Sequence, residues 1–437
     1  MGKERFEIKG GKKLSGDITV AGSKNATVAL LAASVMNKGK TVLKNVPEIE
    51  EVNRWLEVLE SIGAVIKKDG NTLEISYPQG VSIESINRTA AQKTRSVILL
   101  ISSLVRVISG SYLIPQAGGC KLGERTVRPH LFALENFGVN IEVKKKGFLV
   151  SKTKLRPVEN IVLYESGDTV TETAIMVAAQ IPGKTVIKMA SANYMVQDLC
   201  FYLQKLGVKI KGIGTTTLEI WGRRKIRKNV EYHISEDPIE AMFFVSLAIV
   251  TKSELVVKRC PIDFLELELL KLEKMGQKFL ILRKYKASNK KTLLVDIKII
   301  PSALVALKDK IHAMPFPGLN MDNLPFFVPI AMMAKGETLI HDWVYENRAV
   351  YFTELNRLGG NITLIDSHRV KVVGPSKLHS ADLTAPPALR PAAIILVAMF
   401  GAKGDSVLRG VYSINRGYEN LEERLRSVGA EIKFIDD

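Results

Sequence analysis

One arrangement of apolar and polar residues occurs six times along this chain. Each copy opens with a stretch that is apolar on every side, then turns through Gly and Lys into a Thr- and Val-rich strand. An amphipathic helix and a second strand complete it. In the first copy these parts are residues 26–35, 39–43, 52–62 and 72–75. Similarity at a regular spacing is the signature of a repeat architecture.

A glycine follows the amphipathic helix in every copy. These glycines are Gly63, Gly138, Gly207, Gly276, Gly359 and Gly429, which lie 75, 69, 69, 83 and 70 residues apart. The residue just past a helix often adopts the left-handed backbone conformation, which costs glycine least. The spacing therefore marks six helix ends.

The apolar stretches of the other five copies predict buried helices, because an amphipathic surface helix would show a polar face. They are residues 97–105, 173–180, 239–250, 324–334 and 391–400. Strands and two kinds of helix in each copy indicate an α/β fold. We expect two domains of three copies each, residues 21–229 and residues 1–20 plus 230–437, with the crossing at 221–229.

Composition narrows the class of protein. The chain has 437 residues and a net charge of +17, with basic clusters at 223–228 and 144–146. These clusters lack the interleaved aromatic residues of single-strand binders, so we interpret them as solvated surface. Three cysteines without Cys-x-x-Cys spacing and six scattered histidines predict no structural metal and a reducing compartment. We expect no signal peptide at the N-terminus, because no apolar stretch follows its charged residues. The longest apolar run (392–402) is too short to span a bilayer. A soluble, cytoplasmic protein is expected.

One loop has an unusual chemistry. Cys120 lies among Gly118, Gly119 and Gly123, with Lys121, Arg125 and Arg128 nearby. Neighbouring cations favour the thiolate, as in reactive cysteines. Taken alone, a glycine-rich surface loop is the simpler interpretation.

Six short segments, together with the repeats, resemble the enolpyruvyl transferases over essentially the whole chain. Within that family the resemblance is to the members that act on UDP-N-acetylglucosamine rather than on shikimate 3-phosphate. The segments are residues 22–26 (GSKNA), 118–125 (GGCKLGER), 317–322 (PGLNMD), 346–348 (ENR), 389–390 (LR) and 415–419 (NRGYE). The resemblance implies an inside-out α/β barrel of two domains, three repeats in each, with the active site in the cleft between them.

The resemblance also implies a reaction. The carboxyvinyl group of phosphoenolpyruvate would pass to the 3′-hydroxyl of UDP-N-acetylglucosamine with release of phosphate, through a tetrahedral intermediate and without a metal or other cofactor. This is the first committed step of peptidoglycan synthesis in the bacterial cytoplasm. The expected partners are these two small molecules, not a membrane or a nucleic acid, and we expect a monomer.

Phosphoenolpyruvate carries a phosphate and a carboxylate, so its site requires several cations, and arginine binds either oxyanion with two donors. By the resemblance, the phosphate is held by Lys24, Arg125 and Arg416. The carboxylate is held by Arg348 and Arg390. Lys24 and Arg416 also count among the expected catalytic residues.

Two residues are expected to move protons. Asp322 would accept the proton of the attacking sugar hydroxyl, although its place before an apolar helix also suits an N-cap. In this context Cys120 would supply the proton that C3 of phosphoenolpyruvate gains. The resemblance assigns the sugar nucleotide to Asn25, Arg95, His130, Ser166, Asp322 and Val344.

The chain departs from the family pattern on the nucleotide side. Ala388 occupies the place of a family aspartate, Asn193 lies in an altered segment, and Glu165 and Asp168 lie where the diphosphate is expected. Arg128 would offset one of these carboxylates. We therefore expect weakened binding of UDP-N-acetylglucosamine. Two alternatives remain open: a different acceptor, or an impaired paralogue that binds ligand or nucleic acid without turnover.

Overall fold

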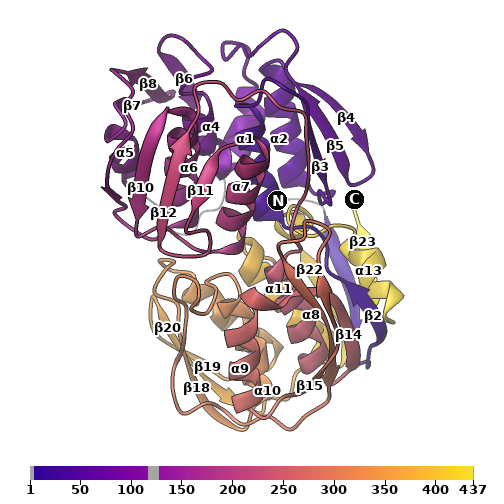
Figure 1. Cartoon of the computed structure of the whole chain (residues 1–437). Helices are drawn as coiled ribbons and strands as arrows, with labels where there is room; N and C mark the ends of the chain where they lie inside the picture. Colours follow the sequence, from indigo (N-terminus) through magenta and orange to yellow (C-terminus); the bar gives the residue numbers. More distant parts are fainter. Residues whose placement is uncertain (1–3, 117–126, 437) are drawn as a thin grey trace. The chain divides into compact units, whose positions relative to one another are not determined.

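The protein, represented by a computed structural model, is described for residues 4–116 and 127–436. The chain divides into two compact units. We call residues 22–116 and 127–235 the first unit, and residues 4–21 and 236–436 the second unit. Each contains three small sheets, and Figure 1 shows the elements of each unit. No helix in these ranges is long and apolar enough to cross a bilayer.

The first unit has three sheets, and the first of them includes a strand from the end of the unit, β13 (Val230–His233). The first has the order β13, β3 (Thr41–Lys44), β5 (Thr72–Ser76), β4 (Val65–Asp69). The second has the order β6 (Tyr112–Pro115), β8 (Gly147–Lys152), β7 (Val139–Lys144). The third has the order β11 (Lys209–Lys211), β12 (Thr217–Gly222), β10 (Gly183–Lys188), β9 (Ile161–Val162).

The helices of the first unit fall into two groups. The buried ones are α1 (Lys24–Ser34), η1 (Arg95–Ile98) with α4 (Leu99–Ser103), and α6 (Asp168–Gln180). The others are α2 (Glu50–Ser61), α3 (Arg88–Lys93), α5 (Arg128–Glu135) and α7 (Tyr194–Lys205). In α2 the side chains of Val52, Trp55, Val58 and Leu59 are buried. This three-to-four-residue spacing places them on one face.

The second unit repeats this plan. Its first sheet has the order β15 (Lys278–Lys286), β16 (Leu293–Ile300), β14 (Glu254–Pro261), β2 (Ser15–Thr19). Its second has the order β17 (Ile311–His312), β18 (Gly336–His341), β20 (Arg369–Gly374), β19 (Ile362–Asp366). Its third has the order β21 (Asp382–Thr384), β22 (Gly404–Arg409), β1 (Arg5–Gly10), β23 (Glu431–Ile435).

Three helical segments form the interior of the second unit. They are α8 (Pro238–Val250), η3 (Leu324–Phe326) with α10 (Phe327–Met333), and α11 (Leu389–Gly401). The remaining helices are η2 (Ile262–Phe264), α9 (Glu266–Lys274), η4 (Ala349–Leu358), α12 (Tyr412–Asn415) and α13 (Leu421–Ser427). Every residue of α8 is buried, as its uniformly apolar sequence predicts.

The predicted helix ends are confirmed. All six repeat glycines have a positive φ, between 83° and 106°. Gly359 follows η4 with φ 90°, and a Cβ there would lie 2.4 Å from the carbonyl oxygen of Lys377. Both the backbone conformation and the close approach therefore require glycine at this position. The six apolar stretches are also helical and buried, so the repeat interpretation and the α/β class are correct.

The chain passes between the units twice, and a strand lies just before each passage. β2 precedes α1 along the chain, yet it pairs in parallel with β14 of the second unit. β13 precedes α8, yet it pairs in parallel with β3 of the first unit. The chain therefore passes from one unit to the other at Ala21–Gly22 and at Ser235–Glu236. The first unit extends beyond Asn229, where the sequence suggested its end.

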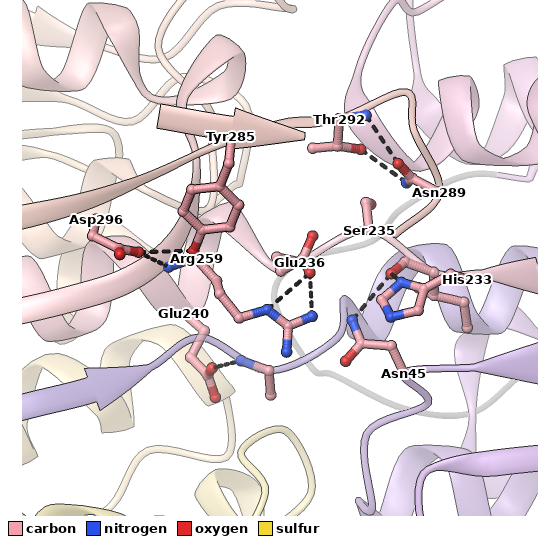
Figure 2. Close-up of polar contacts among 12 residues, drawn as sticks. Asn45, His233, Ser235, Glu236, Glu240, Arg259, Tyr285, Asn289, Thr292 and Asp296 are labelled. Carbon is pink, nitrogen blue, oxygen red and sulfur yellow. Dashed lines mark hydrogen bonds and ion pairs between the residues drawn. The ribbon is translucent and has the colours of Figure 1, made fainter. Parts of the chain in front are cut away.

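Buried carboxylates hold the chain on each side of the second passage. In the first unit, Asp198 accepts hydrogen bonds from the amide and hydroxyl of Ser235 at 2.9 and 2.7 Å. In the second unit, the fully buried Glu236 pairs with the guanidinium of Arg259. Figure 2 shows this pair, and shows Asp296 accepting from the Arg259 amide and the Tyr285 hydroxyl.

Candidate active site

Three of the expected site residues converge in the second unit. Asp322 lies in the loop before η3, Arg348 immediately precedes η4, and Arg390 is the second residue of α11. Asp322 Oδ1 is 3.5 Å from Arg348 Nη1, and Asp322 Oδ2 is 3.7 Å from Arg390 Nη2. These distances exceed those of ordinary N–H···O hydrogen bonds. The carboxylate thus lies between two guanidinium groups without being tightly bound to either.

A buried carboxylate fixes the Arg348 side chain. Asp342 follows β18 and is fully buried, and it pairs with Arg348 through both of its oxygens. Arg348 Nη2 also donates to the carbonyl of Met321 at 2.6 Å. Burial raises the pKa of the Asp342 carboxyl, and the positive charge of Arg348 opposes that rise. Arg348 is itself only 1% exposed, so its orientation is set by these contacts.

Two tyrosines complete the surroundings of the arginines. The guanidinium of Arg348 lies 4.0 Å from the ring centroid of Tyr345, whose hydroxyl donates to Asp322 Oδ1 at 3.4 Å. Arg390 Nη1 donates to the hydroxyl of Tyr418 at 3.0 Å. A guanidinium over an aromatic face is stabilised by the ring quadrupole. The two cations are therefore held by aromatic as well as polar neighbours.

The loop that carries Asp322 is anchored by Glu268 of α9. One oxygen of Glu268 accepts hydrogen bonds from the Asn320 amide at 3.1 Å and from Asn323 Nδ2 at 2.8 Å. Burial raises the pKa of the Glu268 carboxyl, and these hydrogen bonds oppose the rise. Asn323, not Asp322, is the residue that precedes η3. Asp322 is therefore not the N-cap of η3.

The remaining expected residues of the second unit lie on the same elements or beside them. Arg416 directly follows α12 and is partly buried, two residues before Tyr418. Val344 lies partly buried between Asp342 and Arg348 in the chain. Ala388 is buried at the start of α11 and offers no side-chain cap.

In the first unit, Lys24 and Asn25 open α1. Lys24 Nζ donates to Asn25 Oδ1 at 2.7 Å, and Asn25 Nδ2 donates to the Tyr194 hydroxyl at 3.2 Å. Ser23 caps the helix through the Ala26 amide. The backbone amides at a helix start attract anions, so an ammonium at this place suits an anionic ligand.

His130 and Arg95 are also neighbours in the first unit. His130 is the third residue of α5 and is 8% exposed. Its Nδ1 lies 2.9 Å from the hydroxyl oxygen of Thr173. That hydroxyl already donates to the Thr169 carbonyl, so we assign the proton to Nδ1 and leave Nε2 as an acceptor. Burial, and secondarily the charge of Arg95, lowers the pKa of His130 to about 4. His130 is therefore neutral at pH 7.

The carboxylate expected to repel a diphosphate is engaged within the fold. Asp168 opens α6 and accepts from the Ser191 hydroxyl at 2.5 Å and from Asn193 Nδ2 at 3.2 Å. Ser166 is partly buried in the turn before α6, and Glu165 is exposed. Asp168 thus holds the segment that leads into α7.

Cys120 and Arg125 lie outside the described residues. Sequence reasoning missed Asp342, Tyr345 and Glu268. Glu268 and Tyr345 contact the Asp322 loop from distant segments, whereas Asp342 lies six residues before its partner Arg348 in a segment of no regular period. For Tyr418 a signal existed, since it belongs to the segment at 415–419. Among the described side chains, no group of three or more His, Cys, Asp or Glu could hold a metal ion.

Replacement of Asp342 should destabilise the second unit. Asp342→Asn removes the negative charge that neutralises a buried guanidinium, and breaking a buried pair costs about 3 kcal/mol or more. Asp366→Asn is the matched control, because its pair with Arg369 is exposed and should contribute less than about 1 kcal/mol. Urea unfolding followed by circular dichroism compares the two. Equal midpoints for both variants would contradict the assigned role of Asp342.

His130 should remain neutral at pH values where an unfolded histidine is already protonated. In spectra of protein labelled with ¹³C at histidine, the resonance that disappears in His130→Gln should not shift between pH 8 and pH 5.5. An unfolded histidine protonates near pH 6.5, so the folded state loses stability as the pH falls from 6.5 toward 4. A His130 midpoint above pH 6 would overturn the assignment.

Comparison with known proteins agrees with the fold. The EPSP synthase (3-phosphoshikimate 1-carboxyvinyltransferase) family matches residues 8–425. UDP-N-acetylglucosamine 1-carboxyvinyltransferase of Treponema denticola is 33% identical, covering 98% of this chain and 99% of its own. The Campylobacter jejuni protein of that name is 32% identical, covering 99% of each chain.

Solved structures show the same fold. The enolpyruvyl transferase NikO from Streptomyces tendae superposes with a TM-score of 0.86 at 24% identity, covering all of both chains. EPSP synthase from Acinetobacter baumannii gives 0.76 at 18% identity, covering 99% of this chain and 100% of its own. With six repeats, three sheets in each unit and a family match over most of its length, this chain belongs to the EPSP synthase family of enolpyruvyl transferases.

Proposed function

We propose that this enzyme transfers the carboxyvinyl group of phosphoenolpyruvate to the 3′-hydroxyl of UDP-N-acetylglucosamine and releases phosphate. The observation that carries the proposal is the convergence of Asp322 with Arg348 and Arg390 from three separate elements. Two cations next to one carboxylate offer a place for an anionic substrate beside a proton acceptor. The cytoplasmic location and the place in peptidoglycan synthesis belong to the same proposal.

Arg348 and Arg390 are assigned to the carboxylate of phosphoenolpyruvate. Asp342 occupies Nε and Nη2 of Arg348, so Nη1 is the donor directed to substrate in this proposal. Arginine forks bind carboxylates with defined geometry, and the buried partners keep the fork from turning. Lys24, Arg125 and Arg416 are assigned to the phosphate, which the helix start at Lys24 also favours.

The proton transfers balance within this set of residues. The acceptor hydroxyl attacks C2 of phosphoenolpyruvate and passes its proton to Asp322, while C3 gains a proton from Cys120. The resulting tetrahedral adduct returns a C3 proton to the Cys120 thiolate and expels phosphate, which takes up the proton held by Asp322. The vinyl ether is left on the sugar. Asp322 is suited to the first step because the Tyr345 hydroxyl and two guanidinium groups orient its carboxylate.

The choice of UDP-N-acetylglucosamine is supported by relatives of that name which are 31–33% identical over nearly the whole chain. Asn25, Arg95, His130, Ser166, Asp322 and Val344 are the residues assigned to this substrate.

A different acceptor is the second candidate. It is favoured by Ala388, a buried methyl group at the start of α11, where the family pattern has an aspartate. The resemblance links that carboxylate to proton transfer, so this part of the site departs from the family pattern. The match to NikO, which is described only as an enolpyruvyl transferase, is compatible with either candidate.

Phosphate release distinguishes the candidates. We expect phosphate from phosphoenolpyruvate with UDP-N-acetylglucosamine, and none above background with shikimate 3-phosphate. Binding of the UDP sugar, measured by calorimetry, should be detectable at millimolar concentration. If it neither binds nor turns over while another acceptor does, the acceptor assignment fails and the second candidate replaces it.

Asp322→Asn should lower kcat by a factor of about 10² or more, because general-base catalysis typically contributes 10²- to 10⁴-fold. The KM for phosphoenolpyruvate should change much less, since both arginines remain. Asp382→Asn is the control: its pair with Arg409 is exposed in the same unit, and kcat should be unchanged. A kcat for Asp322→Asn within threefold of wild type would exclude Asp322 as the base.

A further inference from the structure

A surface pocket of about 460 Å³ lies in the first unit. Its walls come from three segments that are distant in sequence: the turn between α1 and β3, the end of β5, and the segment before β13. The lining residues are Lys38, Gly39, Lys40, Ser76, Tyr77, Pro78, Arg227, Lys228 and Asn229. Pockets of this size hold ligands as large as a nucleotide.

The lining is strongly cationic. Four of its residues carry a positive charge and none is acidic. Lys40 pairs with Glu74 at 3.2 Å; no described carboxylate forms an ion pair with the side chains of Lys38, Arg227 or Lys228. Like charges gathered around a concave surface repel one another and focus a positive potential on it. A polyanion would relieve that repulsion.

The backbone that presents these cations is fixed before any ligand binds. The buried Asn37 donates to the Lys228 carbonyl at 2.8 Å and accepts from the amides of Lys228 and Gly39 at 3.0 Å each. The Lys38 amide donates to the Ile226 carbonyl at 2.9 Å. A Cβ on Gly39 would lie 2.5 Å from the Lys228 carbonyl oxygen. The two basic segments are therefore locked side by side.

The pocket is separate from the residues assigned to substrate. Lys24 and Asn25 open α1, whereas Lys38 and Lys40 follow its other end. The helix has 11 residues, which at 1.5 Å per residue separates its ends by about 16 Å. A ligand here would act beyond the proposed reaction, and the inference does not depend on that reaction.

We propose that this pocket binds a small soluble anion with two or more linked phosphate groups, such as inorganic triphosphate or a nucleoside triphosphate. Lysine and arginine are the residues that bind phosphate oxygens. Several uncompensated charges around one cavity favour a polyphosphate over a single carboxylate. Nucleic acid would call for an extended groove with stacking aromatics, whereas this pocket is compact and has one aromatic residue, Tyr77.

The test is calorimetric titration of the full-length protein with inorganic triphosphate. Lys38→Gln/Arg227→Gln/Lys228→Gln should weaken binding at least tenfold. The control, Lys144→Gln/Lys145→Gln/Lys146→Gln, removes the same charge from the exposed end of β7 and the turn after it, in the same unit. It should leave binding within twofold. Circular dichroism checks that both variants are folded. In Lys24→Gln, triphosphate binding should be unchanged.

Several results would overturn the proposal. They are no binding to the wild type at millimolar triphosphate, equal loss in both triple variants, or loss confined to Lys24→Gln, which would move the anion to the candidate active site. A further outcome is that the wild type binds single-stranded RNA but not triphosphate, and that the pocket variant no longer binds the RNA. This outcome would assign the pocket to nucleic acid instead. The test measures triphosphate binding and not turnover of phosphoenolpyruvate. A failure of the proposed reaction would therefore not change its result.

Discussion

Burial of helices that are apolar on every side is the constraint on which each unit depends. A helix such as α8, with all its residues buried, can present polar groups only at its ends. Two of the candidate cationic residues are found there: Lys24 opens α1, and Arg390 lies in the first turn of α11. Helix starts also offer unpaired amides and a favourable dipole for anions. A fold of this kind therefore collects anion-binding groups where its buried helices begin.

The second energetic feature is the buried pair of Arg348 and Asp342. A guanidinium that is 1% exposed requires a partner in close contact, and Asp342 supplies it from the end of β18. The pair orients one edge of the arginine toward Asp322. Glu268 holds the loop of Asp322 from another side. Two buried carboxylates that need not touch substrate thus position the two groups that are assigned to it.

The exchange of β2 and β13 shows how chain order and pairing differ. Each four-stranded sheet has an edge strand that runs parallel to its neighbour, and at two places the chain supplies that strand from just beyond a passage between the units. The backbone N–H and C=O groups at an open sheet edge need hydrogen-bond partners. β13 supplies them to β3, and β2 supplies them to β14. The extent of each unit therefore follows from strand pairing.

The sequence by itself determined the repeats, the buried helices and the helix-ending glycines. These are local properties: hydrophobic periodicity and backbone conformation act over a few residues. Only the tertiary structure decided that Asp322 lies between Arg348 and Arg390, that Asp342 and Glu268 support them, and that β13 belongs to the first unit. A side chain's partner, or a strand's neighbour, depends on which distant segments the packed helices bring together, and no local pattern records that.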